Sequence, residues 1–326
     1  MSSPLFIVNP ACGTRKAGDE ITRLLARVHH LYEDVAIRYT NCRGHAEELA
    51  YAGAQAGHPL IVAVGGDGTF SEVANGVLRA EDEAGWPGAA AGGAAERPAL
   101  GLVSIGTGGD LRRTLGIGPG IEASLEALAA GVDRDLDVIR AEFRGRSGGT
   151  VTWYVVNVIS SGLGGLVDRY MESTPSFVPG RVGYYAAALR AAAVSTQEPV
   201  RARIEYQGDT REETIPAYLV AVCNGRWFGG GMDVAPMAQP DDGRLEVVIV
   251  ASPTKPYLLR NIKSVYEGKH LDLPSVSHFS CSRIALSLDD SEDERRILLD
   301  VDGDALGSLP LTAEVVPRRL RVRVHA

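Results

Sequence analysis

Apolar positions in about the first 135 residues follow two alternating patterns. Short apolar runs such as 5–8 and 60–64 are typical of buried strands, and most precede a stretch with apolar residues at helical spacing. Strands alternating with helices favour right-handed crossovers and a parallel sheet. We therefore predict a parallel α/β domain over residues 1–135. Its expected strands are 5–8, 35–39, 60–64 and 100–105, and its expected helices include 19–30, 46–55 and a helix that starts near residue 70.

The pattern changes after about residue 135. Apolar runs of strand length, separated by Gly, Pro and Asp, now follow one another with a single helical stretch near 183–194. This pattern predicts an antiparallel β-sandwich domain over 136–326, whose last residues are able to pack back on the first domain. A Gly/Ala-rich piece at 85–95 is expected to be a surface loop. The expected strands are 151–159, 200–206, 218–222, 245–250, 284–288, 296–301, 311–316 and 320–324.

Composition narrows the choice of partners. A net charge of −8 argues against a nucleic-acid partner, although basic clusters occur at Arg112-Arg113 and between Arg318 and Arg323. Four scattered cysteines without a C-x-x-C pair are typical of a reducing cytoplasm. No apolar run is long enough to cross a bilayer, so we expect a cytoplasmic protein with no transmembrane segment. Membrane contact would then be peripheral and transient.

The most informative motif follows the third predicted strand. Residues 65–72 read Gly-Gly-Asp-Gly-Thr-Phe-Ser-Glu, with Asp67 in the turn and Glu72 expected in the first turn of the next helix. Glycines leave backbone N–H groups exposed at the start of a helix, and such a site binds anions, most often phosphate. A tight strand-to-helix connection without a ligand remains an alternative for this motif alone.

Two further loops are expected at the same edge of the sheet. Residues 106–110 read Gly-Thr-Gly-Gly-Asp after the fourth strand, and residues 9–13 follow the first. Ligands of parallel α/β sheets bind at the carboxyl ends of strands, where all three loops would meet. The chain contains neither Gly-Lys-Ser/Thr of a Walker loop nor G-x-G-x-x-G, so a dinucleotide oxidoreductase is disfavoured.

The second half carries two acidic motifs, each with an ordinary explanation. Asp241-Asp242-Gly243 is a hairpin-turn signal, but its oxygen atoms are also suitable ligands for Mg²⁺. Val301-Asp302-Gly303-Asp304 is equally a turn or a carboxylate pair for proton abstraction, because two nearby acids raise one another's pKa.

Together these motifs resemble the diacylglycerol kinase catalytic-domain family, which includes soluble bacterial lipid kinases and is related to sphingosine and ceramide kinases. Gly-Gly-Asp-Gly-Thr alone also occurs in NAD kinases and, more loosely, in phosphofructokinases. The continuation to Asn75-Gly76 and the later glycine and acidic motifs favour the lipid kinases. The matching residues are Asn9-Pro10 with Gly13, 65–72 with Asn75-Gly76, Gly106-Thr107 with Asp110 and Arg113, Asn224-Gly225, 229–231, Ala235-Pro236 with Ala238, 242–245, and Asp302-Gly303.

The resemblance implies a Rossmann-like nucleotide-binding domain, a β-sandwich domain with a lipid pocket, and transfer of the ATP γ-phosphoryl group to a lipid hydroxyl, most readily that of a diacylglycerol-like acceptor. Asp67 would lie where phosphate, Mg²⁺ and acceptor meet, and Asp304 would act as the base with support from Asp302. Mg²⁺ would be held by Asp242 and the carbonyl groups of Gln239 and Arg244. The nucleotide site would comprise Asn9, Pro10, Ala11, Cys12, Gly13, Thr40, Gly66, Asp67, Gly68, Thr69, Phe70, Ser71, Glu72 and Thr107.

Two residues depart from the family pattern. Gly109 stands where the family usually has asparagine, and Asp304 stands where it usually has glutamate. The aspartate is shorter by about 1.5 Å, and a misplacement of that order can cost about 10²-fold in rate. These departures leave open a weakly active or inactive nucleotide-binding module, beside a kinase of a small alcohol or NAD. The expected partner is a lipid at the membrane surface; a homodimer is left open.

Overall fold

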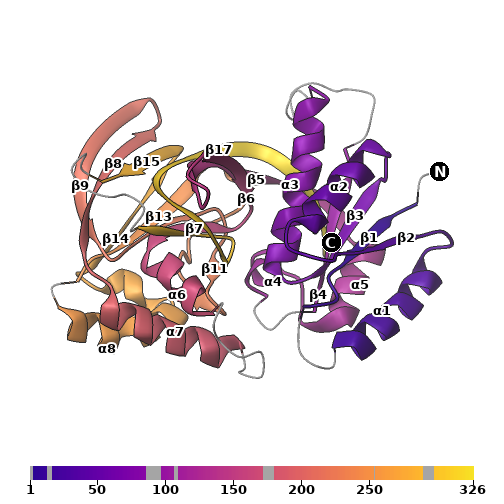
Figure 1. Cartoon of the computed structure of the whole chain (residues 1–326), viewed down its shortest axis with the longest axis horizontal. Coiled ribbons are helices and arrows are strands. Elements are labelled where there is room, and N and C mark those ends of the chain that lie inside the picture. Colours follow the sequence, from indigo (N-terminus) through magenta and orange to yellow (C-terminus); the bar gives the residue numbers. More distant parts are fainter. Residues whose placement is uncertain are drawn as a thin grey trace. The chain divides into compact units, whose positions relative to one another are not determined.

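The computed structural model describes residues 3–12, 17–85, 97–105, 109–171, 180–252, 254–288 and 297–326. The chain divides into two compact units (Figure 1). The first contains Met1–Leu136 together with Arg318–Ala326, and the second contains Asp137–Pro317. No described helix has the length and apolar character needed to cross a membrane.

The first unit is built on a parallel sheet. Its strands are ordered β4-β3-β1-β2, and the end of β17 adds a parallel strand beside β4 through Val322 and Leu100. The predicted α/β class is therefore correct. The strands are β1 (Leu5–Val8), β2 (Ala36–Tyr39), β3 (Leu60–Gly65) and β4 (Ala99–Ser104). The helices are α1 (Ala17–Leu31), α2 (His45–Gln55), α3 (Asp67–Glu83), α4 (Asp110–Thr114) and α5 (Gly120–Ala130).

Alternating strand residues contact helices on the two faces of this sheet. Phe6 and Val62 share an apolar core with α1 and α5. Their neighbours Leu5 and Ile61 point the other way, where a Cβ added to Gly53 of α2 would touch them. Because both faces are covered, β1, β3 and β4 are buried at every position and are rich in apolar residues, which is why the sequence predicts them well.

The second unit is a sandwich of two antiparallel sheets, as expected from the sequence. One sheet has the order β14-β13-β10-β7-β16-β17, and the other has β9-β8-β15-β17-β5-β6. Apolar side chains of both sheets form one core, including Val222, Val247, Ile204 and Leu311. The strands are β5 (Val132–Gly145), β6 (Thr150–Val155), β7 (Val158–Gly162), β8 (Glu198–Tyr206), β9 (Asp209–Ala217), β10 (Leu219–Cys223), β11 (Trp227–Phe228), β12 (Met232–Asp233), β13 (Leu245–Val250), β14 (Val276–Cys281), β15 (Arg283–Ser287), β16 (Leu298–Val301) and β17 (Asp304–Val324).

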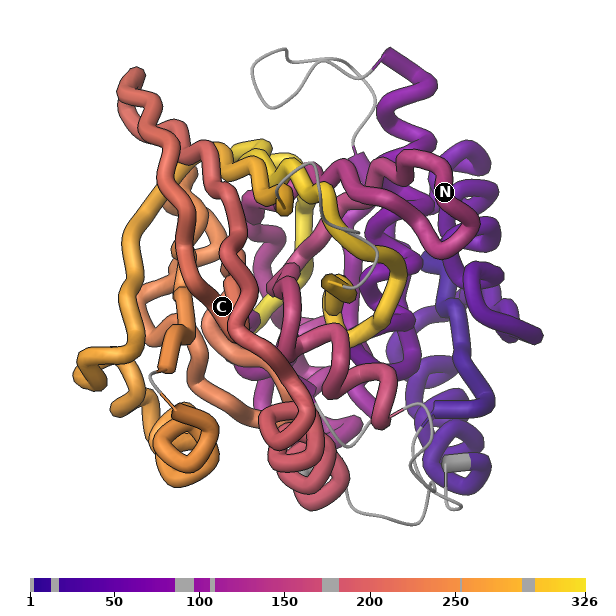
Figure 2. Tube along the Cα trace, turned by 60° about the vertical axis from the view of Figure 1, so that its left-hand side comes forward, coloured from indigo at the N-terminus to yellow at the C-terminus, as the bar shows by residue number. Residues whose placement is uncertain are grey.

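Helices of the second unit correct the sequence prediction of a single one. Its described part contains α6 (Leu163–Met171), α7 (Gly180–Val194), α8 (Lys255–Tyr266) and the short 3₁₀ helix η1 (Lys269–Asp272). Figure 2 shows α7 and α8 nearly end-on, below the long β8–β9 ribbon. The expected loop at 85–95 lies almost wholly outside the described residues.

Two predicted strand boundaries are also wrong. The run 151–159 is divided into β6 and β7, which pair with different neighbours. The runs 311–316 and 320–324 belong to one strand, β17, in which Arg318 has a positive φ of 53°. This residue lies where the chain passes from the second unit to the first.

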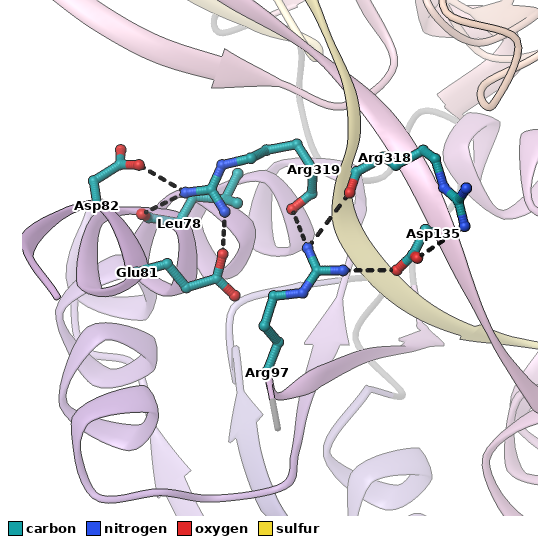
Figure 3. A network of polar contacts seen from close by, with 7 residues as sticks. All are labelled: Leu78, Glu81, Asp82, Arg97, Asp135, Arg318 and Arg319. Carbon is teal, nitrogen blue, oxygen red and sulfur yellow. Dashed lines mark hydrogen bonds and ion pairs between the residues drawn. The ribbon is translucent and has the colours of Figure 1, made fainter. Parts of the chain in front are cut away.

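Basic residues near the C-terminus are held within the first unit by acidic partners (Figure 3). The buried Arg319 binds the buried Glu81 and lies 2.7 Å from Asp82. Arg97 lies 2.9 Å from Asp135, with which Arg318 is also paired. Arg318 and Arg319 of the basic cluster noted in the sequence are thus paired with acidic residues of the first unit.

Candidate active site

The residues predicted to bind nucleotide surround the start of α3. Asp67 is the first residue of this helix, and Gly66 precedes it in an extended conformation. The expectation that Glu72 lies in the first turn is therefore wrong, because Asp67 occupies that turn. A Cβ on Gly65 would lie 2.5 Å from Thr69 Oγ1, so this strand end accepts no side chain.

Hydrogen bonds connect the neighbouring loops to this helix start. Asn9 Nδ2 donates to Thr69 Oγ1 at 3.1 Å, and Asn9 Oδ1 accepts from the backbone N–H of Ala11 at 3.0 Å. The backbone N–H of Asp110 donates to Asp67 Oδ2 at 2.9 Å. Segments that follow β1, β3 and β4 therefore meet at the carboxyl edge of the sheet, as predicted.

The remaining predicted nucleotide residues differ in accessibility. Thr40 donates its backbone N–H to Val8 at the same edge and is half-buried. Pro10 and Ala11 are exposed, and burial raises the pKa of the half-buried Cys12. Phe70 belongs to the core, and Ser71 is buried, so neither side chain is open to solvent. Gly68 is half-buried; Gly13 and Thr107 lie outside the described residues.

Glu72 makes the contacts of a helix cap. Its carboxylate accepts from the backbone N–H groups of Gly44 at 2.8 Å and Ala46 at 3.1 Å, at the start of α2. One turn later, a Cβ on Gly76 would overlap the carbonyl oxygen of Glu47. Glu72 and Gly76 therefore form the contact between α2 and α3, and this supports the position of α3 indirectly.

Gly109 has a conformation that explains which residues fit there. Its φ of 64° and ψ of 40° are left-handed, a region that Gly and Asn adopt most readily. The next helix carries Asp110, whose Oδ1 lies 2.7 Å from Arg113 Nη1. Burial and the nearby Arg113 lower the pKa of Arg112, which donates to the carbonyl oxygen of Ile117.

The acidic turn of the second unit is a two-residue hairpin turn between β16 and β17. Asp302 and Gly303 both have positive φ, and Val301 pairs with Asp304. The Asp302 carboxylate accepts backbone N–H groups at 2.9, 2.9 and 3.2 Å; the donors are Val156, Asn157 and Val158. This explains the break between β6 and β7, and it fixes the turn that presents Asp304.

Sequence reasoning missed a second acidic pair beside this turn. Asp300 is 2% exposed and is hydrogen-bonded to Asp168, itself 5% exposed. Burial raises the pKa of Asp300 to about 7, with smaller contributions from Asp302 and Asp304. The sequence did contain a signal for this pair. Asp300 lies between the apolar residues Leu299 and Val301 in a predicted strand, where a buried apolar residue would be usual.

The predicted Mg²⁺ site lies in the loop before β13. Asp242 Oδ1 accepts from the Arg244 backbone N–H at 3.0 Å, and its Oδ2 lies 3.2 Å from the Arg244 guanidinium. The donors suit Mg²⁺ in kind, but a cation would have to displace this ion pair. The described residues contain no cluster of three or more His, Cys, Asp or Glu side chains. The alternative of a hairpin turn is wrong here, because β12 pairs with β11 rather than with β13.

The glycine run 229–231 borders an apolar cavity within the second unit. All three glycines have positive φ, and a Cβ on Gly230 would press against Tyr184 of α7. The cavity lies among α6, α7, α8 and the face of β10 and β13. Apolar side chains dominate its lining, among them Val167, Leu219, Val248, Leu258 and Val265.

Comparisons with known proteins match both parts of the chain. Residues 3–141 match the diacylglycerol kinase catalytic domain, and residues 157–324 match the YegS C-terminal NAD kinase beta sandwich-like domain. The chain is 25% identical over 314 residues to a diacylglycerol kinase of Bacillus subtilis, covering 95% of this chain and 92% of that protein. It is 28% identical over 305 residues to a probable YegS-like lipid kinase of Chromohalobacter salexigens, covering 92% and 87%.

A solved structure has the same fold. A putative diacylglycerol kinase from Bacillus anthracis superposes with a TM-score of 0.73 at 24% identity, covering 99% of this chain and 97% of that one. At this identity the superposition supports the architecture of the units rather than the roles of individual side chains.

Proposed function

Because the chain belongs to the diacylglycerol kinase catalytic-domain family, with a YegS-type C-terminal domain, we propose that it is an ATP-dependent lipid kinase. It would transfer the γ-phosphoryl group of ATP to the hydroxyl of a diacylglycerol-like lipid. Kinase membership itself implies a phosphotransferase that uses a nucleotide donor. The ATP dependence, the lipid acceptor and the residues below are parts of the proposal.

The observation that carries the proposal is the polar edge of the first unit. At the start of α3, Asn9 donates a hydrogen bond to Thr69, and Asp67 accepts one from the backbone N–H of Asp110. Helix N-termini favour phosphate, and phosphoryl transfer depends mainly on positioning and charge neutralisation. In this proposal Asn9, Thr69 and their neighbouring loops bind the nucleotide, and Asp67 works beside its phosphates.

The second unit would supply the proton acceptor and bind the lipid. We assign Asp304 as the base that takes the hydroxyl proton. Asp302 would fix its turn, because its carboxylate is already engaged by three backbone N–H groups. The apolar cavity among α6, α7 and α8 would hold an acyl chain.

Mg²⁺ would have two uses in this proposal. One ion would neutralise phosphate charge near Asp67, as in other phosphoryl-transfer enzymes. Another would replace the Arg244 guanidinium at Asp242, with the carbonyl groups of Gln239 and Arg244 as further ligands. The acceptor would be reached by peripheral contact with a lipid surface; Arg112 and Arg113 are candidates for it, as is 177–181, of which 177–179 lie outside the described residues.

The test is transfer of labelled phosphate from ATP to vesicles that contain diacylglycerol. We expect label in the organic phase, and we expect Asp67→Asn and Asp304→Asn each to reduce the rate by about 10²-fold or more. A soluble labelled product would instead identify a small alcohol or NAD as the acceptor. Tight ATP binding without any labelled acceptor would favour the nucleotide-binding module that Gly109 and Asp304 suggest.

A further inference from the structure

His270 is a buried polar residue within the lining of the apolar cavity. It belongs to η1 and is 1% exposed. Its neighbours in the cavity lining are the apolar side chains of Val234, Ile262 and Val276. An imidazole in such surroundings requires an explanation, because a buried polar group without a partner is costly.

One hydrogen bond fixes the tautomer of this ring. Nε2 lies 2.9 Å from the carbonyl oxygen of Val234. A carbonyl oxygen only accepts, so Nε2 must carry the proton and Nδ1 must be the unprotonated acceptor. Burial lowers the pKa of His270, which keeps the ring neutral and this assignment stable at physiological pH.

The acceptor nitrogen has no donor within the part of the chain that the structure describes. Nδ1 is buried and makes no hydrogen bond there. Among the polar residues of the cavity lining, Asn261 donates its amide to Tyr257 of its own helix. His270 Nδ1 is therefore an unsatisfied acceptor in a largely apolar lining, which also includes the carboxylate of Asp168, hydrogen-bonded to Asp300. An occupant that matches Nδ1 must bring a donor.

We propose that His270 Nδ1 accepts a hydrogen bond from a hydroxyl or amide N–H of a lipid whose apolar chain occupies this cavity. The inference rests on the proposed function, since it takes the cavity as the chain site of the phosphoryl acceptor. Among diacylglycerol-like acceptors it favours lipids that carry a donor besides the hydroxyl to be phosphorylated, so a diacylglycerol, with its single hydroxyl, would be the weaker substrate. An acceptor with only the reacting hydroxyl leaves Nδ1 unsatisfied.

The test uses two isomers that differ in one donor. Decanol and methyl nonyl ether have the same atoms and nearly the same apolar surface, but only decanol donates a hydrogen bond. Calorimetric titration of the full chain without nucleotide measures both affinities. We expect decanol to bind about tenfold more tightly, which corresponds to one hydrogen bond to an otherwise unsatisfied acceptor.

Variants test whether the preference for decanol over the ether depends on the His270 imidazole. His270→Phe removes the acceptor, so the two affinities are expected to become equal. His270→Gln keeps an acceptor oxygen and a donor for Val234, so part of the preference is expected to return. Val265→Ala alters the same cavity without touching polar groups, and it should change both affinities alike.

The test does not depend on kinase activity, because it measures binding of the two isomers and not phosphate transfer. Equal binding of the isomers to the wild-type chain, or binding of neither, overturns the inference even if the variants do not fold. A preference that persists in His270→Phe overturns it as well. If decanol is preferred but no lipid is ever phosphorylated, the proposed function fails and the ligand site stands.

Discussion

At the scale of single residues, backbone N–H groups govern the acidic turn of the second unit. The Asp302 carboxylate accepts hydrogen bonds from three of them, whereas Asp304 is the first residue of β17 and pairs with Val301 of β16. The sequence showed two acids in a turn and could not separate these roles, because the donors to Asp302 lie about 145 residues earlier. The two acids should therefore respond differently to substitution.

Replacing Asp302 by asparagine should destabilise the fold. The amide would direct an N–H group at one backbone donor, and a buried polar group left unsatisfied costs about 1–3 kcal/mol. Urea unfolding measures the loss. Asp304→Asn is the matched control, because it removes the neighbouring acid without touching the three N–H groups. Equal stability of the two variants would contradict the distinction.

Asp300 should make stability depend on pH. Its pKa is raised from an ordinary 3.8 to about 7 by burial, so the folded state favours the protonated carboxyl. The stabilisation from this proton is complete below the ordinary value and is lost as pH rises to about 7. Asp300→Asn keeps a neutral group that can accept from Gly303 and contact Asp168, so it should remove this dependence.

Urea unfolding of both proteins between about pH 4 and pH 8 gives the readout for Asp300. The stability of the wild type relative to the variant should fall as pH rises from about 4 to about 7 and should then level off. A difference that is independent of pH would mean that Asp300 is ionised throughout.

At the scale of elements, apolar periodicity predicted the strands and helices whose pattern is visible in their own residues. The strands β1, β3 and β4 were found because parallel strands covered on both faces are rich in apolar residues. Helix α6 was missed because Gly164 and Gly165 lower its helix propensity, yet both are required for close contact with Ser160 and Leu298. The residues proposed to bind nucleotide were selected by motif rather than by periodicity, and Glu72 shows the limit of that approach. A motif match selects a residue such as Glu72 without indicating its role, and the structure shows that this residue caps a helix.

The α2–α3 contact gives a test at this scale. Gly76→Ala places a methyl group against the carbonyl oxygen of Glu47, so the helices must separate, and we expect a cost of about 1–3 kcal/mol. Thermal unfolding measures it. Gly18→Ala is the control, since a Cβ there meets nothing within 4 Å. A wild-type melting temperature for Gly76→Ala would show that the two helices are less tightly packed.

At the scale of the whole molecule, the last nine residues belong to the unit formed by the first 136. Their side chains are held by Asp133, Asp135 and Glu81 rather than by strand pairing alone. From the sequence these arginines could be described only as a basic cluster, because their acidic partners are far away in the chain. Burial raises the pKa of Glu81 despite its arginine partner. Loss of that partner should therefore destabilise the fold more than loss of a partner in an exposed ion pair.

Arg319→Met should therefore be strongly destabilising. It leaves Glu81 buried without its partner, and such losses amount to about 3–5 kcal/mol. Adding Glu81→Leu removes the stranded carboxylate and should recover much of the loss. Arg27→Met is the control, because the Arg27–Glu122 pair is exposed and such pairs contribute about 1 kcal/mol or less. Urea unfolding of the four proteins decides whether Arg319 differs from a surface arginine.

The return of β17 to the first sheet also sets an order of events during synthesis. The strand beside β4 is made of residues that are translated after the whole of the second unit. The unit that begins the chain therefore cannot complete its sheet until the entire second unit has been translated, although domains usually fold as units from the N-terminus. A nascent chain that stops before Arg318 contains all residues of the second unit but lacks the arginines that pair with Glu81, Asp133 and Asp135. The sheet edge proposed to bind nucleotide would thus be translated before the residues that complete its sheet.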